Sequence, residues 1–188
     1  MKIDKPSVLY DEERVRTRIA ELGVAITAAY AGREVCVVGL MKSCMVFMAD
    51  LIRAIPLNMT CHFIRASALP GAGPGAACTD IVYSTEIPYA DRHILLLDDI
   101  IDTGITLNYL LGQIREARPA ALKVCALVDK PGERKVDVHP DWTAFTLDES
   151  EDRFLVGYGL DFGEHYRGLP YIGTIPRPAS VPSGAQES

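Results

Sequence analysis

Apolar residues recur at helical spacing in three segments of the chain. Between residues 11 and 30 they fall every three or four positions after an acidic first turn, and Gly32 follows the segment. These positions are Val15, Ile19, Leu22, Ile26 and Ala29. The other two segments are residues 45–54 and residues 105–116. Pro56 prevents the first of these from continuing as a helix. The pattern therefore predicts three helices.

Between these segments lie short apolar runs that are typical of buried strands. They cover residues 35–40, 59–64, 81–85, 94–97, 123–128 and 154–157. Because such runs alternate with helices, the pattern predicts an α/β fold with a doubly wound, mostly parallel sheet.

The length of 188 residues suits one domain with a full core, which we place at residues 1–176. Residues 66–80 are rich in Gly, Ala and Pro and show no period, so we expect a mobile loop there. The tail at residues 177–188 has the composition of a disordered segment.

Composition narrows the classes of partner. The net charge of −6 argues against a nucleic-acid-binding groove, which is usually basic. No run of 18 apolar residues and no signal-peptide core occurs, so we expect no membrane association. The five cysteines are an odd number with no CxxC pair, and we expect small buried hydrophobes in a cytoplasmic protein.

The most informative stretch is residues 93–107. A strand-like run ends in Asp98 and Asp99, Asp102 follows, and a short Thr/Gly loop then opens an apolar helix. Ligands of open α/β sheets bind at the carboxyl ends of strands, and a helix N-terminus favours anions. Carboxylates for sugar hydroxyls and Mg²⁺ beside a phosphate cradle indicate a phosphorylated-sugar site. The alternative is an ordinary acidic turn with a threonine cap.

The string DDxxDTGxT resembles the phosphoribosyl-pyrophosphate (PRPP) signature of type I phosphoribosyltransferases, and residues 10–175 are similar to the hypoxanthine-guanine phosphoribosyltransferase family. The resemblance implies the type I phosphoribosyltransferase fold, with a small hood built from the chain termini. It also implies Mg²⁺ as cofactor, PRPP and a purine base as ligands, and a homodimer or homotetramer.

By this resemblance, Asp98 and Asp99 accept hydrogen bonds from the ribose hydroxyls and organise Mg²⁺. The usual pair is Glu-Asp, so one side chain here is shorter by a methylene. Asp102 matches the proposed general base, although capping its own loop is an alternative role. The phosphate cradle comprises Thr103, Gly104, Ile105 and Thr106.

Two further matches concern the leaving pyrophosphate. Met41, Lys42 and Ser43 resemble a loop in which a non-proline cis peptide, here between Met41 and Lys42, turns amides toward pyrophosphate. Ser43 stands where glycine is usual. Arg167 matches an arginine whose planar fork suits phosphate oxygens.

The remaining matches concern the purine. Lys130 resembles the lysine that donates to the O6 of a 6-oxopurine, and a donor-only ammonium should reject adenine. In the stretch FLVGYGLD, Phe154 would stack on the base and the Leu155 backbone would contact its edge. Asp161 would hold a Mg²⁺ shared with pyrophosphate.

One departure is the replacement of the family's Ser-Tyr loop pair by Ala68 and Leu69. Closure of that loop excludes water, so we expect reduced but real activity. The leading hypothesis is transfer of phosphoribosyl from PRPP to hypoxanthine and also guanine. Two alternatives stay open, namely a related transferase for another heterocycle and a PRPP- or nucleotide-sensing regulator with little catalysis.

Overall fold

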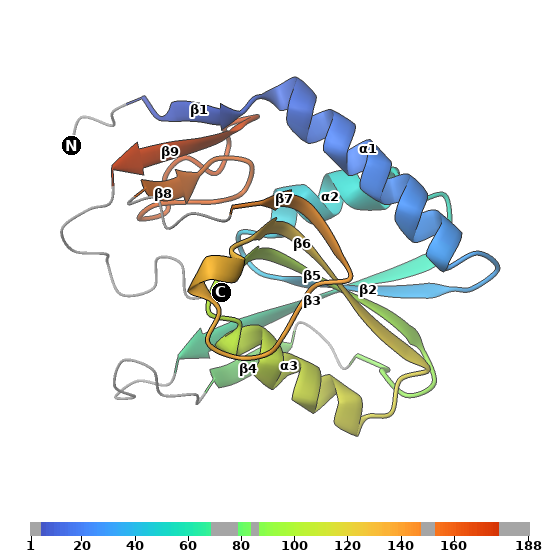
Figure 1. The fold of residues 1–188 in the computed structure, drawn as a ribbon. Helices are drawn as coiled ribbons and strands as arrows, with labels where there is room; N and C mark the ends of the chain where they lie inside the picture. The colour runs from blue at the N-terminus through green and yellow to red at the C-terminus, as the bar shows by residue number, and fades with distance from the viewer. Residues whose placement is uncertain (1–4, 69–78, 84–86, 148–152, 177–188) are drawn as a thin grey trace.

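The computed structural model describes residues 5–68, 79–83, 87–147 and 153–176. Leu69, the central part of the predicted mobile loop and the predicted tail lie outside the described residues. Figure 1 shows a sheet with helices on both faces and a smaller sheet near the carboxyl ends of its parallel strands.

The main sheet has six strands in the order β4-β3-β2-β5-β6-β7. Five of them run parallel, and β4 pairs antiparallel with β3 at one edge. The strands are β2 (Val35–Leu40), β3 (Met59–Ala68), β4 (Thr79–Tyr83), β5 (His93–Ile101), β6 (Ala121–Asp129) and β7 (Trp142–Thr146). The predicted α/β class and doubly wound, mostly parallel sheet are confirmed.

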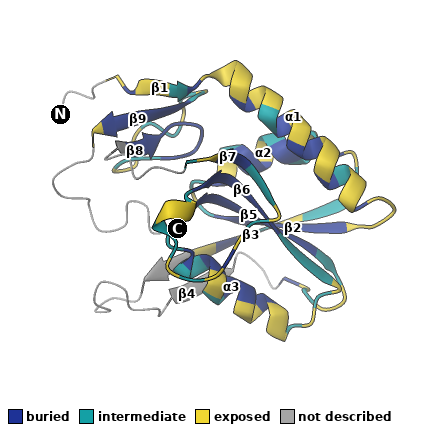
Figure 2. Ribbon diagram, viewed as in Figure 1, coloured by how far each residue is buried: buried dark blue, intermediate teal, exposed yellow. Residues whose placement is uncertain are grey.

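Both faces of the sheet are buried. Helices α1 (Glu12–Ala29) and α2 (Met45–Arg53) cover one face, and α3 (Ile105–Glu116) covers the other. Along β5, Leu95 and Leu97 pack with α1 and α2, while the alternating residues pack with α3. This two-sided burial explains the continuous apolar runs of the central strands, which are dark blue in Figure 2.

The smaller sheet is the hood. Its three strands, β1 (Ser7–Tyr10), β8 (Arg153–Val156) and β9 (Ile172–Pro176), lie in the antiparallel order β1-β9-β8. It joins the start of the described chain to its end, beside the carboxyl ends of the parallel strands (Figure 1). The expected hood from the termini is therefore present.

The three predicted helices are confirmed within one or two residues of their expected ends. β3 and β5 extend beyond the predicted runs, because β5 continues through two buried acids and β3 continues into the predicted loop. β4 starts two residues earlier than expected. The apolar pattern did not identify β1, β7 and β9, which are only four or five residues long.

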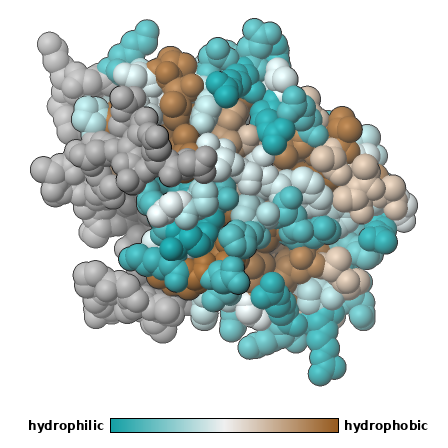
Figure 3. All heavy atoms as spheres, in the orientation of Figure 1, coloured by the Kyte–Doolittle hydropathy of each residue, from teal (hydrophilic) through white to brown (hydrophobic). Residues whose placement is uncertain are grey.

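Cysteine burial corrects one expectation. Cys36, Cys44 and Cys125 are buried, but Cys61 is exposed. In the part of the chain that the structure describes, no helix is both long and apolar enough to cross a bilayer. On the face seen in Figure 3, hydrophobic residues form separate patches among hydrophilic ones.

Candidate functional site

The carboxyl end of β5 holds two adjacent buried acids. Asp98 is 1% exposed and Asp99 is 3% exposed, and the Asp99 backbone amide donates to Asp98 Oδ1 at 2.9 Å. Burial raises the pKa of the Asp98 carboxyl well above its usual range, and the neighbouring charge of Asp99 raises it further.

The loop after β5 leads directly into α3. Gly104 has φ of 76°, and a Cβ there would lie 2.5 Å from Val138 Cγ1, so only glycine fits. Gly104 is the N-cap residue of α3, and it makes no side-chain hydrogen bond to cap the helix. The Thr103 Oγ1 accepts from the Ile105 amide at 3.4 Å, and Thr106 lies half-buried in the first turn. The predicted cradle residues therefore surround one helix N-terminus.

Asp102 is half-buried between β5 and this loop. Its Oδ1 accepts a hydrogen bond from the Thr103 amide, which is the capping role considered from the sequence. The second carboxylate oxygen is not used in that bond, so the cap does not exclude a further hydrogen bond from a ligand.

The segment after β6 packs directly on the loop between β5 and α3. The Lys130 amide donates to the Ile101 carbonyl at 2.9 Å, and the Lys135 amide donates to the Thr103 carbonyl at 2.9 Å. The side chain of Lys130, 14% exposed, lies 3.4 Å from Glu133 Oε1. The predicted purine-binding lysine thus lies beside the predicted phosphate cradle.

Arg134 also contacts the candidate site, although the sequence patterns did not indicate it. Its Nη1 donates to the Asp102 carbonyl oxygen at 2.9 Å, and its Nη2 pairs with the Asp129 carboxylate. Both side chains of this pair are nearly buried, at 9% and 12% exposure. A lone arginine in a polar loop gives no signal in a single sequence.

The loop between β2 and α2 has the predicted conformation. The peptide bond between Met41 and Lys42 is cis. The Ser43 Oγ accepts from Arg167 Nη1 at 3.0 Å. Residues 157–171, which connect β8 to β9 and are called the hood segment here, lie directly against this loop. A Cβ at Gly159 in this segment would lie 2.2 Å from the Ser43 carbonyl oxygen. The structure therefore brings the four predicted pyrophosphate residues together.

Arg167 also organises the hood segment itself. Its Nη2 lies 2.8 Å from Asp161 Oδ1, and its Nη1 donates to the Gly159 carbonyl at 2.9 Å. The Tyr158 hydroxyl donates to Asp50 Oδ2 at 2.8 Å and so ties this segment to α2. Asp161, 11% exposed, is thereby held beside the loop of Met41, Lys42 and Ser43.

Phe154 and Leu155 lie in β8 and are both buried, at 4% and 2% exposure. The Phe154 ring meets the Phe162 ring edge to face, with the centroids 5.3 Å apart. In this structure Phe154 contributes to the small core of the hood.

Asp98 and Asp99 could supply only part of a metal site. Among the described residues, no three His, Cys, Asp or Glu side chains form a cluster that could hold a metal ion. Asp98 and Asp99 are nonetheless adjacent buried carboxyls, and a divalent cation would relieve their repulsion. Carboxylate oxygens are also the ligands that Mg²⁺ prefers, with water and substrate phosphates completing its shell. Asp98 and Asp99 therefore fit a Mg²⁺ site whose other ligands come from water and the substrate.

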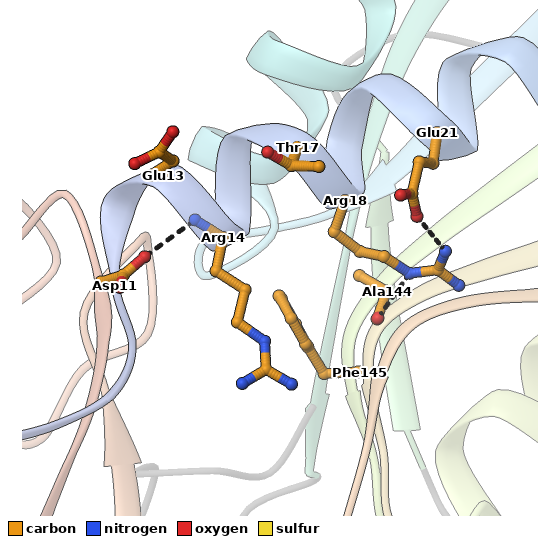
Figure 4. Close-up of a pocket in the computed structure, with 8 residues that line it drawn as sticks. All are labelled: Asp11, Glu13, Arg14, Thr17, Arg18, Glu21, Ala144 and Phe145. Carbon is orange, nitrogen blue, oxygen red and sulfur yellow. Dashed lines mark hydrogen bonds and ion pairs between the residues drawn. The ribbon is translucent and has the colours of Figure 1, made fainter.

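Among the described residues, α1 borders two of the surface cavities. One of about 580 Å³ is bordered by Arg14, Arg18 and Phe145 and contains none of the predicted site residues (Figure 4). Arg18 is already bonded there to the carbonyl oxygens of Thr143 and Ala144. The other, of about 550 Å³, lies between α1, α2 and the hood segment and is bordered by Arg167.

Comparison with known proteins agrees with this geometry. The phosphoribosyl transferase domain model matches residues 7–163. The hypoxanthine-guanine phosphoribosyltransferase of Bacillus subtilis is 37% identical over 175 residues, covering 93% of this chain and 96% of that protein. The hypoxanthine phosphoribosyltransferase of Haemophilus influenzae is 38% identical over 181 residues, covering 93% and 98%.

A solved structure gives the same result. The hypoxanthine-guanine phosphoribosyltransferase of Bacillus anthracis, with a HEPES molecule in its active site, has a TM-score of 0.85 and 34% identity, covering 92% of this chain and 99% of that one. The matches extend over nearly the whole chain in both sequence and fold. The chain therefore belongs to the phosphoribosyltransferase domain family, in the group of the hypoxanthine-guanine phosphoribosyltransferases.

Proposed function

We propose that this protein is a purine-salvage enzyme that transfers the 5-phosphoribosyl group of PRPP to a 6-oxopurine. Hypoxanthine gives IMP, guanine gives GMP, and pyrophosphate leaves in both reactions. The proposal rests mainly on the arrangement at the end of β5. There, two buried acids are followed within a few residues by the Gly104 loop and by the start of α3.

Asp98 and Asp99 would accept hydrogen bonds from the ribose hydroxyls. The residues from Thr103 to Thr106 would hold the 5′-phosphate with backbone amides and threonine hydroxyls at the positive end of α3. Such a cradle needs no phosphate-binding lysine of its own. Holding both ends of the sugar orients C1′ for the transfer.

The pyrophosphate would bind where the Met41–Lys42 loop meets Arg167. Lys42 and Arg167 supply positive charge, and the loop supplies amides. Mg²⁺, held by Asp98, Asp99 and Asp161, would neutralise charge on the leaving group. The paired burial of Asp98 and Asp99 supports this assignment.

Lys130 would donate to the purine O6, and Phe154 and the Leu155 backbone would contact the ring. As the C1′–O bond breaks and a bond forms from C1′ to the purine, Asp102 would accept the ring proton near N7. Adenine carries an amine where Lys130 needs an acceptor, so it should be rejected.

The proposal includes a homodimer or homotetramer and no nucleic-acid partner. It also includes the cytoplasm as the compartment, which the four free thiols at Cys36, Cys44, Cys61 and Cys125 support.

A spectrophotometric assay tests the function. The protein is mixed with PRPP, Mg²⁺ and hypoxanthine, guanine, xanthine or adenine in turn. The proposal predicts IMP and pyrophosphate from hypoxanthine and no product from adenine. Thermal stabilisation by PRPP without any nucleotide product would instead identify a sensing regulator. Product from another heterocycle alone would identify a related transferase.

A further inference from the structure

One carboxylate joins the two cations of the proposed pyrophosphate site. Glu164 Oε1 lies 2.6 Å from Lys42 Nζ, and Glu164 Oε2 lies 3.3 Å from Arg167 Nη2. Lys42 comes from the loop after β2, whereas Arg167 comes from the hood segment. Each oxygen of Glu164 therefore serves a different cation, as two phosphate oxygens would.

The backbone holds Glu164 in this place. Phe162 and His165 exchange two hydrogen bonds of 3.2 Å, which closes a tight turn around it. The Glu164 amide donates to Asp161 Oδ2 at 2.8 Å, and its φ of 66° lies in the left-handed region. Its position in the turn thus does not depend on its own carboxylate.

The Glu164 carboxylate is accessible enough for another anion to replace it. The Glu164 side chain is 63% exposed and that of Lys42 is 47% exposed, whereas Arg167 is only 18% exposed. The hydrogen bond from Lys42, assisted by Arg167, lowers the pKa of Glu164, so the carboxylate is charged at neutral pH. Exposed ion pairs of this kind are weak and break readily.

We propose that Glu164 is an affinity-setting residue of the pyrophosphate site, where its carboxylate competes with the pyrophosphate group for Lys42 and Arg167. This inference rests on the proposed function, since it takes that site as the place where the pyrophosphate of PRPP binds. Entry of pyrophosphate displaces the carboxylate, and return of the carboxylate assists release of the product. Glu164 thereby weakens PRPP binding and limits inhibition by pyrophosphate.

The test is the Glu164→Gln variant, which keeps the length of the side chain and removes its charge. Binding of inorganic pyrophosphate with Mg²⁺ is measured by calorimetry on the full chain. We expect tighter binding by about two- to thirtyfold, the range for losing two weak ion pairs. Because salt screens exposed charges, the difference between the two proteins should shrink at high salt.

Glu34→Gln is the matched control. It removes the carboxylate from another exposed pair, in which Arg92 Nη2 lies 2.6 Å from Glu34 Oε1 before the start of β2. This control should bind pyrophosphate like the unmodified protein. Steady-state kinetics add a second readout: Glu164→Gln should lower the KM for PRPP and increase product inhibition by pyrophosphate.

Weaker or unchanged pyrophosphate binding by Glu164→Gln overturns the inference, since Glu164 would then position Lys42 or do nothing. Absence of binding in both proteins also overturns it. Failure of the proposed function is recognised separately, as lack of IMP formation by the unmodified protein. In that case the binding comparison still decides whether Glu164 competes for the two cations.

Discussion

Arg134 donates a 2.9 Å hydrogen bond to the backbone carbonyl of Asp102, and the same guanidinium pairs with the buried Asp129. It therefore connects the end of β6 to the loop that carries the proposed base and phosphate cradle. A Cβ at Gly104 would lie 3.0 Å from Arg134 Cδ, so the arginine also lies against the turn of that loop. We infer that Arg134 is a positioning residue for Asp102.

Arg134→Met should lower kcat/KM for PRPP by about 100-fold, because displacing a reacting group by about 1 Å costs that much. It should also destabilise the protein by roughly 3–5 kcal/mol, since Asp129 stays buried without its cation. Urea unfolding and steady-state kinetics measure the two effects. Adding Asp129→Asn should restore most of the stability but not the activity. Recovery of both would show that Arg134 acts only on stability.

Gly104→Ala should destabilise the protein by about 1–3 kcal/mol, because φ of 76° strains an L residue and the new Cβ meets Val138. It should also raise the KM for PRPP by tenfold or more, roughly the effect of a misplaced binding loop. Gly112→Ala in α3 is the control, because a Cβ there meets nothing within 4 Å. We expect it to stabilise the helix by about 0.5–1 kcal/mol and to leave the KM unchanged. Equal effects of the two variants would contradict the account of the loop.

Lys130→Gln should reduce kcat/KM for hypoxanthine by about 100-fold. It should also reduce the enzyme's preference for hypoxanthine over adenine, because the glutamine amide can both donate and accept a hydrogen bond. The assay is initial rates with the two bases at saturating PRPP. Lys123→Gln, on the strand β6 that Lys130 follows, removes a surface pair with Asp141 at 3.1 Å and should leave base preference unchanged. A Lys130 variant with unchanged preference would place base selection elsewhere.

Tyr30 gives a pH dependence of stability. Its hydroxyl donates to the Ile94 carbonyl at 2.9 Å, and burial raises its pKa above the ordinary value. The folded state keeps the proton when the unfolded chain loses it, so the free energy of unfolding falls as pH rises above about 10. Tyr30→Phe should flatten that fall in urea unfolding at alkaline pH. Parallel curves for the two proteins would show that Tyr30 does not contribute.

The central part of the site was predictable because its residues are consecutive in the sequence. The residues from Asp98 to Thr106 follow one another through a strand end, a loop and a helix start, so local pattern fixes their relative places. The cis peptide at Met41–Lys42 was expected from the family resemblance alone and is present.

The contacts between distant loops were not predictable. Glu164 and Lys42 are 122 positions apart in the sequence, and Arg134 and Asp102 are 32 apart. Their meeting depends on how the hood and the β6 loop dock on the sheet, which hydrophobic periodicity does not encode. The short strands β1, β7 and β9 were missed because they are defined by pairing with distant neighbours.

The central claim is that the acids of β5 and the amides of the following loop bind PRPP. A crystal structure of the protein with PRPP and Mg²⁺ tests it most directly. The account predicts the 5′-phosphate at the amides of residues 103–106, the ribose hydroxyls on Asp98 and Asp99, and the pyrophosphate between Lys42 and Arg167 with Glu164 displaced. PRPP bound elsewhere, or a loop that holds no phosphate at saturating PRPP, would contradict it.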